Sequence, residues 1–296
     1  MKITNTHNIP DVFMRYAKLD KYSKGDSDIS VTTLIDSPRI AKLRQIHEES
    51  LTKDISEMTF ALLGTAVHGI LEDTGPSAGE VYEERLYATI FNTKLSGAID
   101  VQKFLPDGSV LIQDYKVCSV WSVLGDKPEW ERQLNCYAWL VERSKQVPVG
   151  GLQIVAILRD WQRSKAQFQA DYPPTNVVVV DVPLWDSARR LSYIEERVLA
   201  HQNLQENIWG DALPLCSDAE RWAKPTQWAV MKKGRKSAVK LFDDAREAEL
   251  FIKNSKDAGV LSVETRLGEF TRCENNYCGV AQYCSQHTGV DNEQSI

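Results

Sequence analysis

No run of apolar residues in this sequence approaches the roughly 20 that a membrane-spanning helix needs. The first residues, MKITNTHNIPDVFMRY, lack the apolar core of a signal peptide. A phosphate-binding P-loop, internal repeats and low-complexity tracts are absent as well, which disfavours a helicase or another ATP-driven motor. We therefore expect a soluble, cytoplasmic protein without membrane contacts, and any motor that it works with is a separate protein.

Positive charge is also scarce. The chain has 35 lysines and arginines against 41 aspartates and glutamates, a net charge of -6. This balance argues against a protein coated with positive charge for nonspecific duplex binding, so any nucleic-acid contact must come from a local patch. Apolar residues make up 43% of the 296 residues, which is enough to bury the core of one large domain or of one domain plus an appendage.

The stretch GAIDVQKFLPDGSVLIQDYKV, residues 97–117, places three charges in a predicted β-hairpin. Its centre, Pro106-Asp107-Gly108, is typical of a three-residue hairpin loop. That loop puts Asp100 opposite Asp114, and because side chains alternate along a strand, Lys116 shares their face. A two-residue loop would instead shift the register by one residue and turn Asp100 to the other face.

Two aspartates and a lysine on one small patch allow two interpretations. Paired carboxylates repel each other unless a cation joins them, and their oxygens suit a hard divalent ion such as Mg²⁺ or Mn²⁺. A neighbouring lysine can then orient an attacking water or stabilise developing negative charge. The alternative is a structural salt bridge between Asp114 and Lys116 with Asp100 merely solvated.

Flanking motifs favour the first interpretation. GTAVHGILED lies upstream and QLNCYAWL downstream of the hairpin, and with them the chain resembles the RecB-like branch of the PD-(D/E)XK nuclease superfamily. This branch includes the AddB nuclease domain, CRISPR-adaptation nucleases and phage-encoded exonucleases. Its pattern is G-x-x-x-H, G-x-x-D, D/E-x-K and Q-x-x-x-Y, in that order. The matching residues here are Gly64 and His68, Gly97 and Asp100, Asp114 and Lys116, and Gln133 and Tyr137.

The resemblance implies a fold and a set of metal ligands. The fold is α/β, a restriction-endonuclease-like core with a central mixed β-sheet flanked by helices. His68, Asp100 and Asp114 would bind Mg²⁺ or Mn²⁺, with the carbonyl of Tyr115 as a further ligand, and Lys116 would be the catalytic lysine beside the two aspartates.

The resemblance also implies supporting residues. Gln133 and Tyr137 would line the catalytic site or hold the substrate, and either Glu83 or Glu84 would add an acidic group.

Helical patterns support the placement of these motifs. Apolar spacing over 58–73 predicts a helix with His68 on or near a buried face, where a histidine without a ligand role is the alternative. The segment 126–143 begins with a capping signal and predicts a second helix. Gln133 and Tyr137 then lie on one face, and a buried hydrogen-bonding pair is the alternative interpretation.

A local basic patch lies in MKKGRKSAVK, around a turn at Gly234, with Trp222 and Trp228 just before it. Basic groups neutralise phosphates and exposed aromatics stack on bases, so this patch could grip single-stranded DNA. A solvated hairpin whose tryptophans pack inward is the alternative. The segment 227–263 predicts strand, turn, strand, helix and strand, a small α+β insert. The candidate DNA-binding residues are Lys232, Lys233, Arg235 and Lys236.

Cysteines are concentrated near the end of the chain. Cys118 and Cys136 fall in predicted core elements and are most simply small buried hydrophobes. The last three cysteines, in RCENNYCGVAQYC, are spaced C-x4-C-x5-C and need one more thiolate to complete a four-cysteine site. The candidate ligands are Cys216, Cys273, Cys278 and Cys284.

RecB-like relatives often bind an iron–sulfur cluster through three C-terminal cysteines and one remote N-terminal cysteine. This chain has Ser37 at the corresponding N-terminal place, and its C-terminal spacing is looser than the usual C-x2-C-x5-C. An iron–sulfur cluster, Zn²⁺ and free or partly oxidised thiols therefore all stay open. Secretory disulfides are not expected in the cytoplasm.

The remaining segments complete the predicted architecture. Two β-branched strands, 151–158 and 176–182, would extend the sheet, and the polar loop between them would either border the DNA path or be solvated. A long amphipathic helix follows over 185–205. We expect a nuclease core over 1–216, a basic insert over 217–270 and a cysteine-rich segment over 271–296.

The expected function is a metal-dependent DNA nuclease, an exonuclease acting at DNA ends in phage or mobile-element recombination, replication or repair. A structure-specific endonuclease shares all the site chemistry. A DNA-end-binding assembly factor on a nuclease fold is the non-enzymatic alternative. The expected partner is DNA that is single-stranded or has free ends, with a separate helicase, single-strand-binding or recombinase protein as a possible second partner.

Overall fold

The computed structural model describes residues 1–19, 24–125, 127–204, 212–275 and 277–289, and the chain forms two compact units. Unit 1 comprises Met1–Pro38 and Glu48–Glu206, and unit 2 comprises Arg39–His47 and Asn207–Ile296. The chain therefore enters unit 2 early, returns to unit 1, and enters unit 2 again. The predicted division into 1–216, 217–270 and 271–296 stays a prediction.

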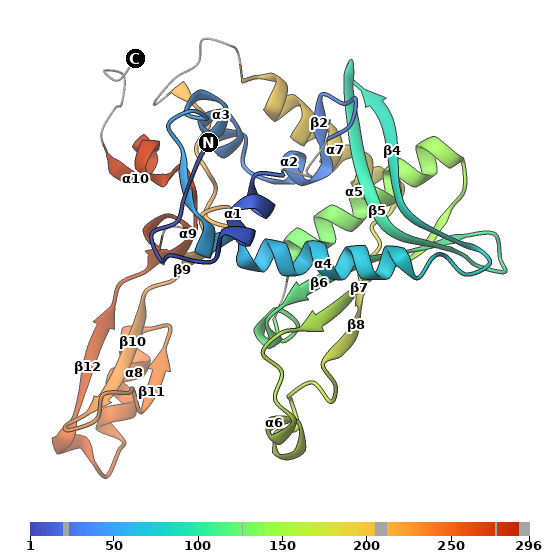
Figure 1. The fold of residues 1–296 in the computed structure, drawn as a ribbon. Coiled ribbons are helices and arrows are strands. Elements are labelled where there is room, and N and C mark those ends of the chain that lie inside the picture. Colours follow the sequence, from blue (N-terminus) through green and yellow to red (C-terminus); the bar gives the residue numbers. More distant parts are fainter. Residues whose placement is uncertain (20–23, 126, 205–211, 276, 290–296) are drawn as a thin grey trace. The chain divides into compact units, whose positions relative to one another are not determined.

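Unit 1 is built on a mixed six-stranded sheet with the order β2-β5-β6-β7-β8, in which β4 also pairs with β5. The β5–β6, β7–β8 and β4–β5 pairs are antiparallel, whereas β6–β7 and β2–β5 are parallel. Figure 1 shows β4 and β5 as long, curved neighbours. The strands are β2 (Ile29–Ser30), β4 (Glu80–Ile90), β5 (Thr93–Phe104), β6 (Val110–Cys118), β7 (Val149–Leu158) and β8 (Val177–Val182).

The β5–β6 hairpin has the predicted loop and register. The backbone N–H of Leu105 donates to the carbonyl of Ser109 at 2.8 Å, and Gly108 has the positive φ of 83° that the last loop position requires. Val101 pairs with Gln113 at the end of the paired segment, and continuing this register by one residue brings Asp100 opposite Asp114.

Helices cover this sheet. The central α5 begins with proline at its first position, ends at a left-handed Gln146, and is buried from Gln133 to Val141. It contacts β4 to β8, and α7 packs on α5 and on α2. The core therefore lies between α5 and the sheet. The helices of unit 1 are α1 (Asp11–Ala17), α2 (Val31–Ile35), α4 (Thr59–Asp73), α5 (Pro128–Lys145), α6 (Arg163–Phe168) and α7 (Ser187–Gln202), and a small pair of strands is β1 (Lys2–Thr4) with β3 (Thr52–Asp54).

These elements confirm the predicted class, an α/β protein with a central mixed sheet flanked by helices, and are consistent with the predicted restriction-endonuclease-like core. The predicted helix over 126–143 is α5, although residue 126 lies outside the described residues. Within the part of the chain that the structure describes, no helix has both the length and the apolar character needed to cross a membrane.

Unit 2 contains the predicted small α+β element. β10 pairs antiparallel with β11 and with β12, α8 packs on all three strands, and a turn at Gly234 with φ 85° follows β10. This is the predicted order of strand, turn, strand, helix and strand. The elements of unit 2 are α3 (Pro38–Ile46, of which all but Pro38 belongs to unit 2), β9 (Ala223–Lys224), β10 (Gln227–Lys232), β11 (Lys240–Phe242), α8 (Ala245–Lys253), β12 (Leu261–Arg266), β13 (Glu269–Phe270), α9 (Thr271–Glu274) and α10 (Ser285–Thr288).

Candidate functional site

Three carboxylates lie side by side across β4, β5 and β6. Glu83 and Asp100 lie between the Tyr82–Val101 and Glu84–Ile99 pairs of β4 and β5, and Asp100 and Asp114 are the next residues after the Val101–Gln113 pair of β5 and β6. Residues directly opposite on neighbouring strands point to the same face of a sheet. Local strand pairing thus gathers three acidic side chains in one row on one face of unit 1.

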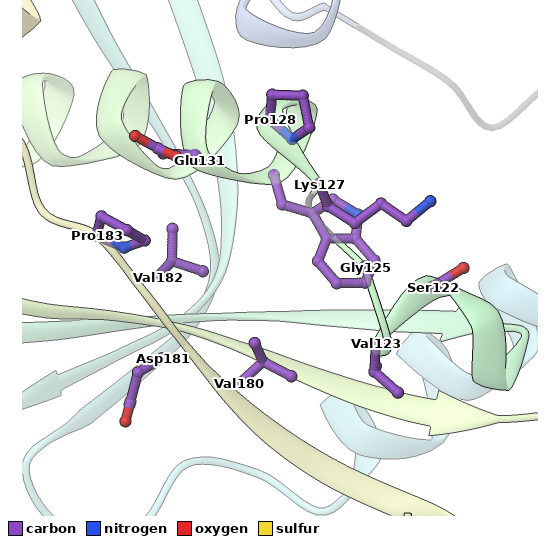
Figure 2. Close-up of a pocket in the computed structure, with 11 residues that line it drawn as sticks. Ser122, Val123, Gly125, Lys127, Pro128, Glu131, Val180, Asp181, Val182 and Pro183 are labelled. Atoms are coloured by element: carbon purple, nitrogen blue, oxygen red, sulfur yellow. The ribbon is translucent and has the colours of Figure 1, made fainter. Parts of the chain in front are cut away.

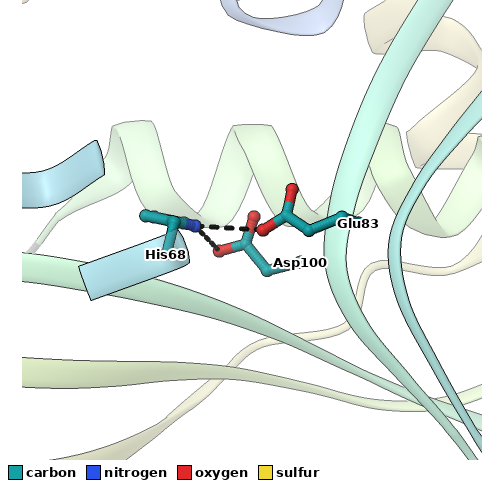
Figure 3. A group of neighbouring side chains, drawn as sticks. All are labelled: His68, Glu83 and Asp100. Atoms are coloured by element: carbon teal, nitrogen blue, oxygen red, sulfur yellow. Dashed lines mark hydrogen bonds and ion pairs between the residues drawn. The ribbon is translucent and has the colours of Figure 1, made fainter. Parts of the chain in front are cut away.

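His68 of α4 joins this row. Its Nδ1 lies 3.2 Å from Oε1 of Glu83 and 3.6 Å from Oδ2 of Asp100. Figure 3 shows the three side chains pointing toward one another from α4, β4 and β5. One ligand atom from each of His68, Glu83 and Asp100 lies within 4.8 Å of the others, a group compatible with a divalent metal ion.

The backbone singles out Glu83 rather than Glu84. Glu83 has a φ of 48°, the left-handed region that side chains other than glycine rarely adopt, at a strain of roughly 1–3 kcal/mol. Glu84 instead accepts a hydrogen bond from Gln102 at 2.8 Å and pairs with Lys145. Of the two glutamates considered from the sequence, only Glu83 therefore faces His68.

Asp114, Lys116, Gln133 and Tyr137 form a connected chain of contacts. The Nζ of Lys116 lies 2.6 Å from Oδ2 of Asp114. The Nε2 of Gln133 donates to Oδ1 of Asp114 at 3.0 Å and to the hydroxyl of Tyr137 at 2.9 Å. Asp114 is only 2% exposed, so α5 orients a buried carboxylate through Gln133. Gln133 therefore links the Tyr137 hydroxyl to Asp114.

Gly97 makes room for this arrangement. A Cβ atom at Gly97 would come within 2.7–2.8 Å of ring carbons of Tyr137 and a methyl carbon of Leu140. Close packing of α5 on β5 thus requires glycine at this position. At Gly64, by contrast, a Cβ atom would meet nothing within 4 Å, so packing does not explain that glycine.

Burial and a neighbouring negative charge both act on the pKa of Asp100, the middle carboxylate of the row. Burial, reinforced by the neighbouring charge of Asp114, raises the pKa of Asp100 to about 7, although the charges of His68 and Lys116 act in the opposite direction. The backbone N–H of Tyr115 also donates to Oδ2 of Asp100 at 2.7 Å. The prediction that the carbonyl of Tyr115 is a metal ligand stays a prediction.

Neighbouring carboxylates also act on the two basic groups of the site. Its hydrogen bond with Glu83 raises the pKa of His68, and this effect, with the charge of Asp100, outweighs burial, which lowers it. Burial also lowers the pKa of Lys116, but the charge and hydrogen bond of Asp114 outweigh it and the net shift is upward. The carboxylates of the site thus favour the protonated forms of both His68 and Lys116.

The predicted burial of the His68 helix differs from the observed one. None of the α4 side chains is fully buried, and His68 itself is about one-third exposed. The apolar spacing that predicted a buried face instead leaves Phe60, Leu63 and Ile70 exposed.

The four cysteines predicted as cluster or zinc ligands all belong to unit 2. Cys278 and Cys284 are buried, and burial raises the pKa of the Cys278 thiol. The side chain of Gln286 makes two hydrogen bonds with the backbone of Cys216, at 2.8 and 2.9 Å. Among the described residues no three of these sulfur atoms come together as closely as the ligand atoms around His68, so the four-cysteine site stays a prediction.

Sequence reasoning missed one residue beside these cysteines, Arg39 of α3. Its guanidinium is only 1% exposed and donates to Sγ of Cys284 at 3.2 Å, to the carbonyl of Leu213 at 2.9 Å and to the hydroxyl of Ser285 at 2.7 Å. No spacing in the sequence links Arg39 with a segment 245 residues away.

The basic patch lies in unit 2, at the end of β10 and the turn that follows. Lys233, Arg235 and Lys236 are exposed, whereas Lys232 pairs with Asp257 at 2.5 Å. Trp222 is half-exposed, with the guanidinium of Arg272 5.5 Å from its ring centroid. The structure thus gathers the predicted basic residues on one hairpin.

Two cavities flank the connection between β6 and α5. One, of about 430 Å³, lies between this connection and β8, and Figure 2 shows Val180, Val182 and Pro183 on its β8 side. The other, of about 470 Å³, is lined by Trp121 and by the segment that follows β7. Neither cavity is lined by His68, the carboxylates or Lys116.

Comparisons with known proteins add little to this geometry. No family model matches the chain, and a search of curated proteins finds no match. A search of solved structures matches the crystal structure of SSO0001 at 16% sequence identity with a TM-score of 0.43, covering 64% of this chain and 84% of that chain. A likeness at this TM-score carries no argument about function.

Proposed function

We propose that this protein is a metal-dependent DNA nuclease of the RecB-like branch of the PD-(D/E)XK superfamily. The observation that supports it best is the convergence of His68, Glu83 and Asp100 beside the paired Asp114 and Lys116. A protein that only binds DNA ends has no chemical reason to keep three carboxylates and a lysine together. The resemblance of the ordered motifs points in the same direction.

The residues fit a divalent ion. The neighbouring carboxylates of Asp100 and Asp114 repel each other, and the raised pKa of Asp100 reports this repulsion together with burial. Apart from its ion pair with Lys116, the buried Oδ2 of Asp114 has no hydrogen-bond donor within the described ranges. Carboxylate oxygens with one imidazole suit Mg²⁺ or Mn²⁺, with His68, Glu83, Asp100 and Asp114 as the ligands.

The chain's own groups have distinct parts in hydrolysis. A bound ion supplies positive charge that polarises the scissile phosphate and lowers the pKa of a bound water. Water would add to phosphorus as the bond to one sugar oxygen breaks; it would give up one proton and the leaving oxygen would gain one, so that a phosphate is left on one strand end and a hydroxyl on the other. Lys116 positions this water and offsets developing negative charge, Asp114 orients Lys116, and Gln133 holds Asp114.

An exonuclease acting at DNA ends in phage or mobile-element recombination, replication or repair is the form that the resemblance favours. A helicase, single-strand-binding or recombinase protein would then supply the DNA end. A structure-specific endonuclease would use the same residues. Cleavage of circular DNA, tested below, distinguishes the two forms. A cytoplasmic location stays a prediction.

The test is cleavage of end-labelled linear and closed circular single-stranded DNA with Mg²⁺, with Mn²⁺ and with chelator. We expect metal-dependent loss of the linear substrate, and a decrease of about 100- to 1,000-fold in Lys116→Ala. Lys103→Ala is the matched control, because Lys103 lies on neighbouring β5 and pairs with Glu80 instead. Cutting of the circle would identify an endonuclease, whereas wild-type rates in Lys116→Ala would refute the proposed site.

We also propose that the cysteines of unit 2 hold a metal centre, either an iron–sulfur cluster or Zn²⁺. The burial of Cys216, Cys278 and Cys284 and the attachment of the Cys216 segment to α10 support this. Elemental analysis for iron and zinc, with an absorbance spectrum of the purified protein, distinguishes the two metals from free thiols.

A further inference from the structure

An exposed tryptophan lies just beyond the catalytic strand. β6 carries Asp114 and Lys116, ends at Cys118, and leads into the 3-10 turn η2 (Val120–Ser122). Five residues of extended chain span at most about 18 Å, so Trp121 lies within a few nucleotides of a phosphate at the proposed site. Trp121 is 77% exposed, the highest value of any tryptophan among the large exposed apolar residues.

The turn that carries Trp121 is held in place. Val120 is only 4% exposed and belongs to the core of unit 1. Its backbone N–H donates to Oδ1 of Asp160 at 2.7 Å, and the N–H of Arg159 donates to the carbonyl of Cys118 at 3.0 Å. Because the turn is anchored on both sides, the indole is presented outward at little further entropic cost on binding.

A second aromatic group lies at the same end of β6. Phe60, at the start of α4, is 60% exposed, and the guanidinium of Arg159 lies 4.3 Å from its ring centroid. α4 also carries His68, eight residues or roughly 12 Å further along the helix axis. Both elements that supply site residues therefore reach exposed aromatic rings near Cys118.

The cavity beside Trp121 has the chemistry of a base-binding subsite. Its volume of about 470 Å³ falls within the range of roughly 300–1,000 Å³ typical of small-ligand sites. Its lining includes the indole of Trp121, apolar Leu124, and amides that can both donate and accept hydrogen bonds. The other polar or aromatic residues that line it are Asp160, Gln162, Lys165, Gln169, Asp171 and Tyr172, so that Lys165 stands against two carboxylates.

We propose that this cavity binds an unpaired nucleobase of the DNA strand whose phosphate lies at the carboxylate row. The base stacks on Trp121, and the Phe60–Arg159 pair contacts the neighbouring nucleotide. Stacking of this kind accepts any base and requires that the bases be unpaired, so it selects single-stranded DNA or frayed ends. This inference rests on the proposed function for its position, but the binding that it describes does not require cleavage.

The test is the affinity of the full-length protein for a fluorescent 12-nucleotide oligo(dT), measured by anisotropy in chelator. We expect Trp121→Ala to weaken binding about 5- to 100-fold and Trp121→Phe to restore most of it. Binding of a blunt duplex of the same length should change less than twofold. Phe168→Ala is the matched control, because Phe168 is 85% exposed on α6 but does not line the cavity.

The outcomes separate this inference from the proposed nuclease. If the wild-type protein cuts DNA but Trp121→Ala binds oligo(dT) within twofold of wild type, the nuclease stands and the base-binding subsite is wrong. If no DNA is cut but Trp121→Ala still loses affinity, the subsite stands and the nuclease is wrong. Absence of oligo(dT) binding by the wild-type protein would overturn the subsite. Unchanged thermal unfolding of the exposed-site variants verifies that they are folded.

Discussion

At the scale of single residues, Glu83 and Glu84 show what one step of strand register decides. The sequence offers both as acidic contributors, and nothing in the local sequence distinguishes two adjacent glutamates. Pairing of β4 with β5 places Glu83 beside His68 and Asp100, while Glu84 binds Gln102 and Lys145. The choice depends on how β4 and β5 align, and contacts between the two strands set that alignment. Residue propensities describe each residue by itself and do not contain this information.

Replacement of Glu83 should separate ion binding from stability. We expect Glu83→Gln to weaken Mn²⁺ binding at least about 10-fold, measured by isothermal titration calorimetry, because it removes one charged oxygen ligand. Glu84→Gln is the control and should bind Mn²⁺ as the wild type does. Equal losses of Mn²⁺ affinity in the two variants would show that Glu83 contributes no more to ion binding than Glu84 does.

The same variant should stabilise the fold in chelator, since it removes one of three neighbouring negative charges. We expect the free energy of unfolding of Glu83→Gln to rise by roughly 0.5–1 kcal/mol in urea titrations without metal. A loss of stability would indicate that the Glu83–His68 hydrogen bond outweighs the carboxylate repulsion.

The position of Asp100, by comparison, could be predicted. The Pro106-Asp107-Gly108 turn sets the register locally, over a few residues, and hairpin loops of this length have few geometries. The row of Asp100 and Asp114 therefore follows from the sequence, whereas its extension to Glu83 does not.

At the scale of elements, α7 is tied to α2 through the last carbonyls of α2. The Nε of Arg197 donates to the carbonyl of Leu34 at 3.1 Å and its Nη2 to that of Asp36 at 2.5 Å. The Nε2 of His201 lies 3.3 Å from the same Leu34 carbonyl. Cationic and polar groups thus satisfy the C-terminal end of α2, as the helix dipole favours.

Stability should depend on pH through His201. Burial, with the charge of Arg197, lowers the pKa of His201 below its usual 6.5. The unfolded chain therefore takes up the proton first, so this contribution to stability is complete above about pH 6.5 and is lost as the pH falls through the folded-state pKa. We expect His201→Gln to lose less stability than the wild type between pH 7.5 and pH 5.5 in urea titrations.

His7→Gln is the control for this measurement, because His7 is exposed. It should show the same loss of stability between the two pH values as the wild-type protein. A His201→Gln profile that coincides with the wild-type profile would mean that the acid sensitivity arises elsewhere.

Elements with a strong local pattern could be predicted, but their burial could not. The spacing in α4 correctly indicates a helix, yet none of its side chains is fully buried. Periodicity reports which side chains share a face, and only the tertiary structure decides what covers that face. By contrast, α5 is buried over nine consecutive residues because it packs on the sheet on one side and on α7 on the other.

At the scale of the whole molecule, the division into units depends on α3. The segment Arg39–His47 belongs to unit 2 although the chain on both sides of it belongs to unit 1. Within unit 2, the ring of His47 stacks on Tyr283 at 4.0 Å between centroids, and Arg39 contacts Cys284. No composition change or linker marks this excursion, so the sequence could not predict it.

Removal of the Arg39 side chain should destabilise unit 2. Arg39→Ala deletes three hydrogen bonds from a buried guanidinium, at a cost of roughly 3 kcal/mol or more. Hydrogen exchange should then accelerate in Ser285–Thr288 while α5 keeps its protection. Arg235→Ala, at an exposed turn position, is the control. Equal acceleration in α5 would show that the two units unfold together.

The excursion of α3 also has a consequence for how the chain is made. During synthesis the ribosome releases Arg39 long before Cys284, 245 residues later, and so unit 2 cannot close until its last segment emerges. Until then, the apolar side chains of α3 lack their packing partners in unit 2. Meanwhile the ribosome synthesises strands β4 to β8 of the unit 1 sheet, which lie between α3 and the rest of unit 2 in the sequence. A contiguous fragment that starts after residue 48 would lack this piece of unit 2, and supplying α3 as a separate peptide should restore it.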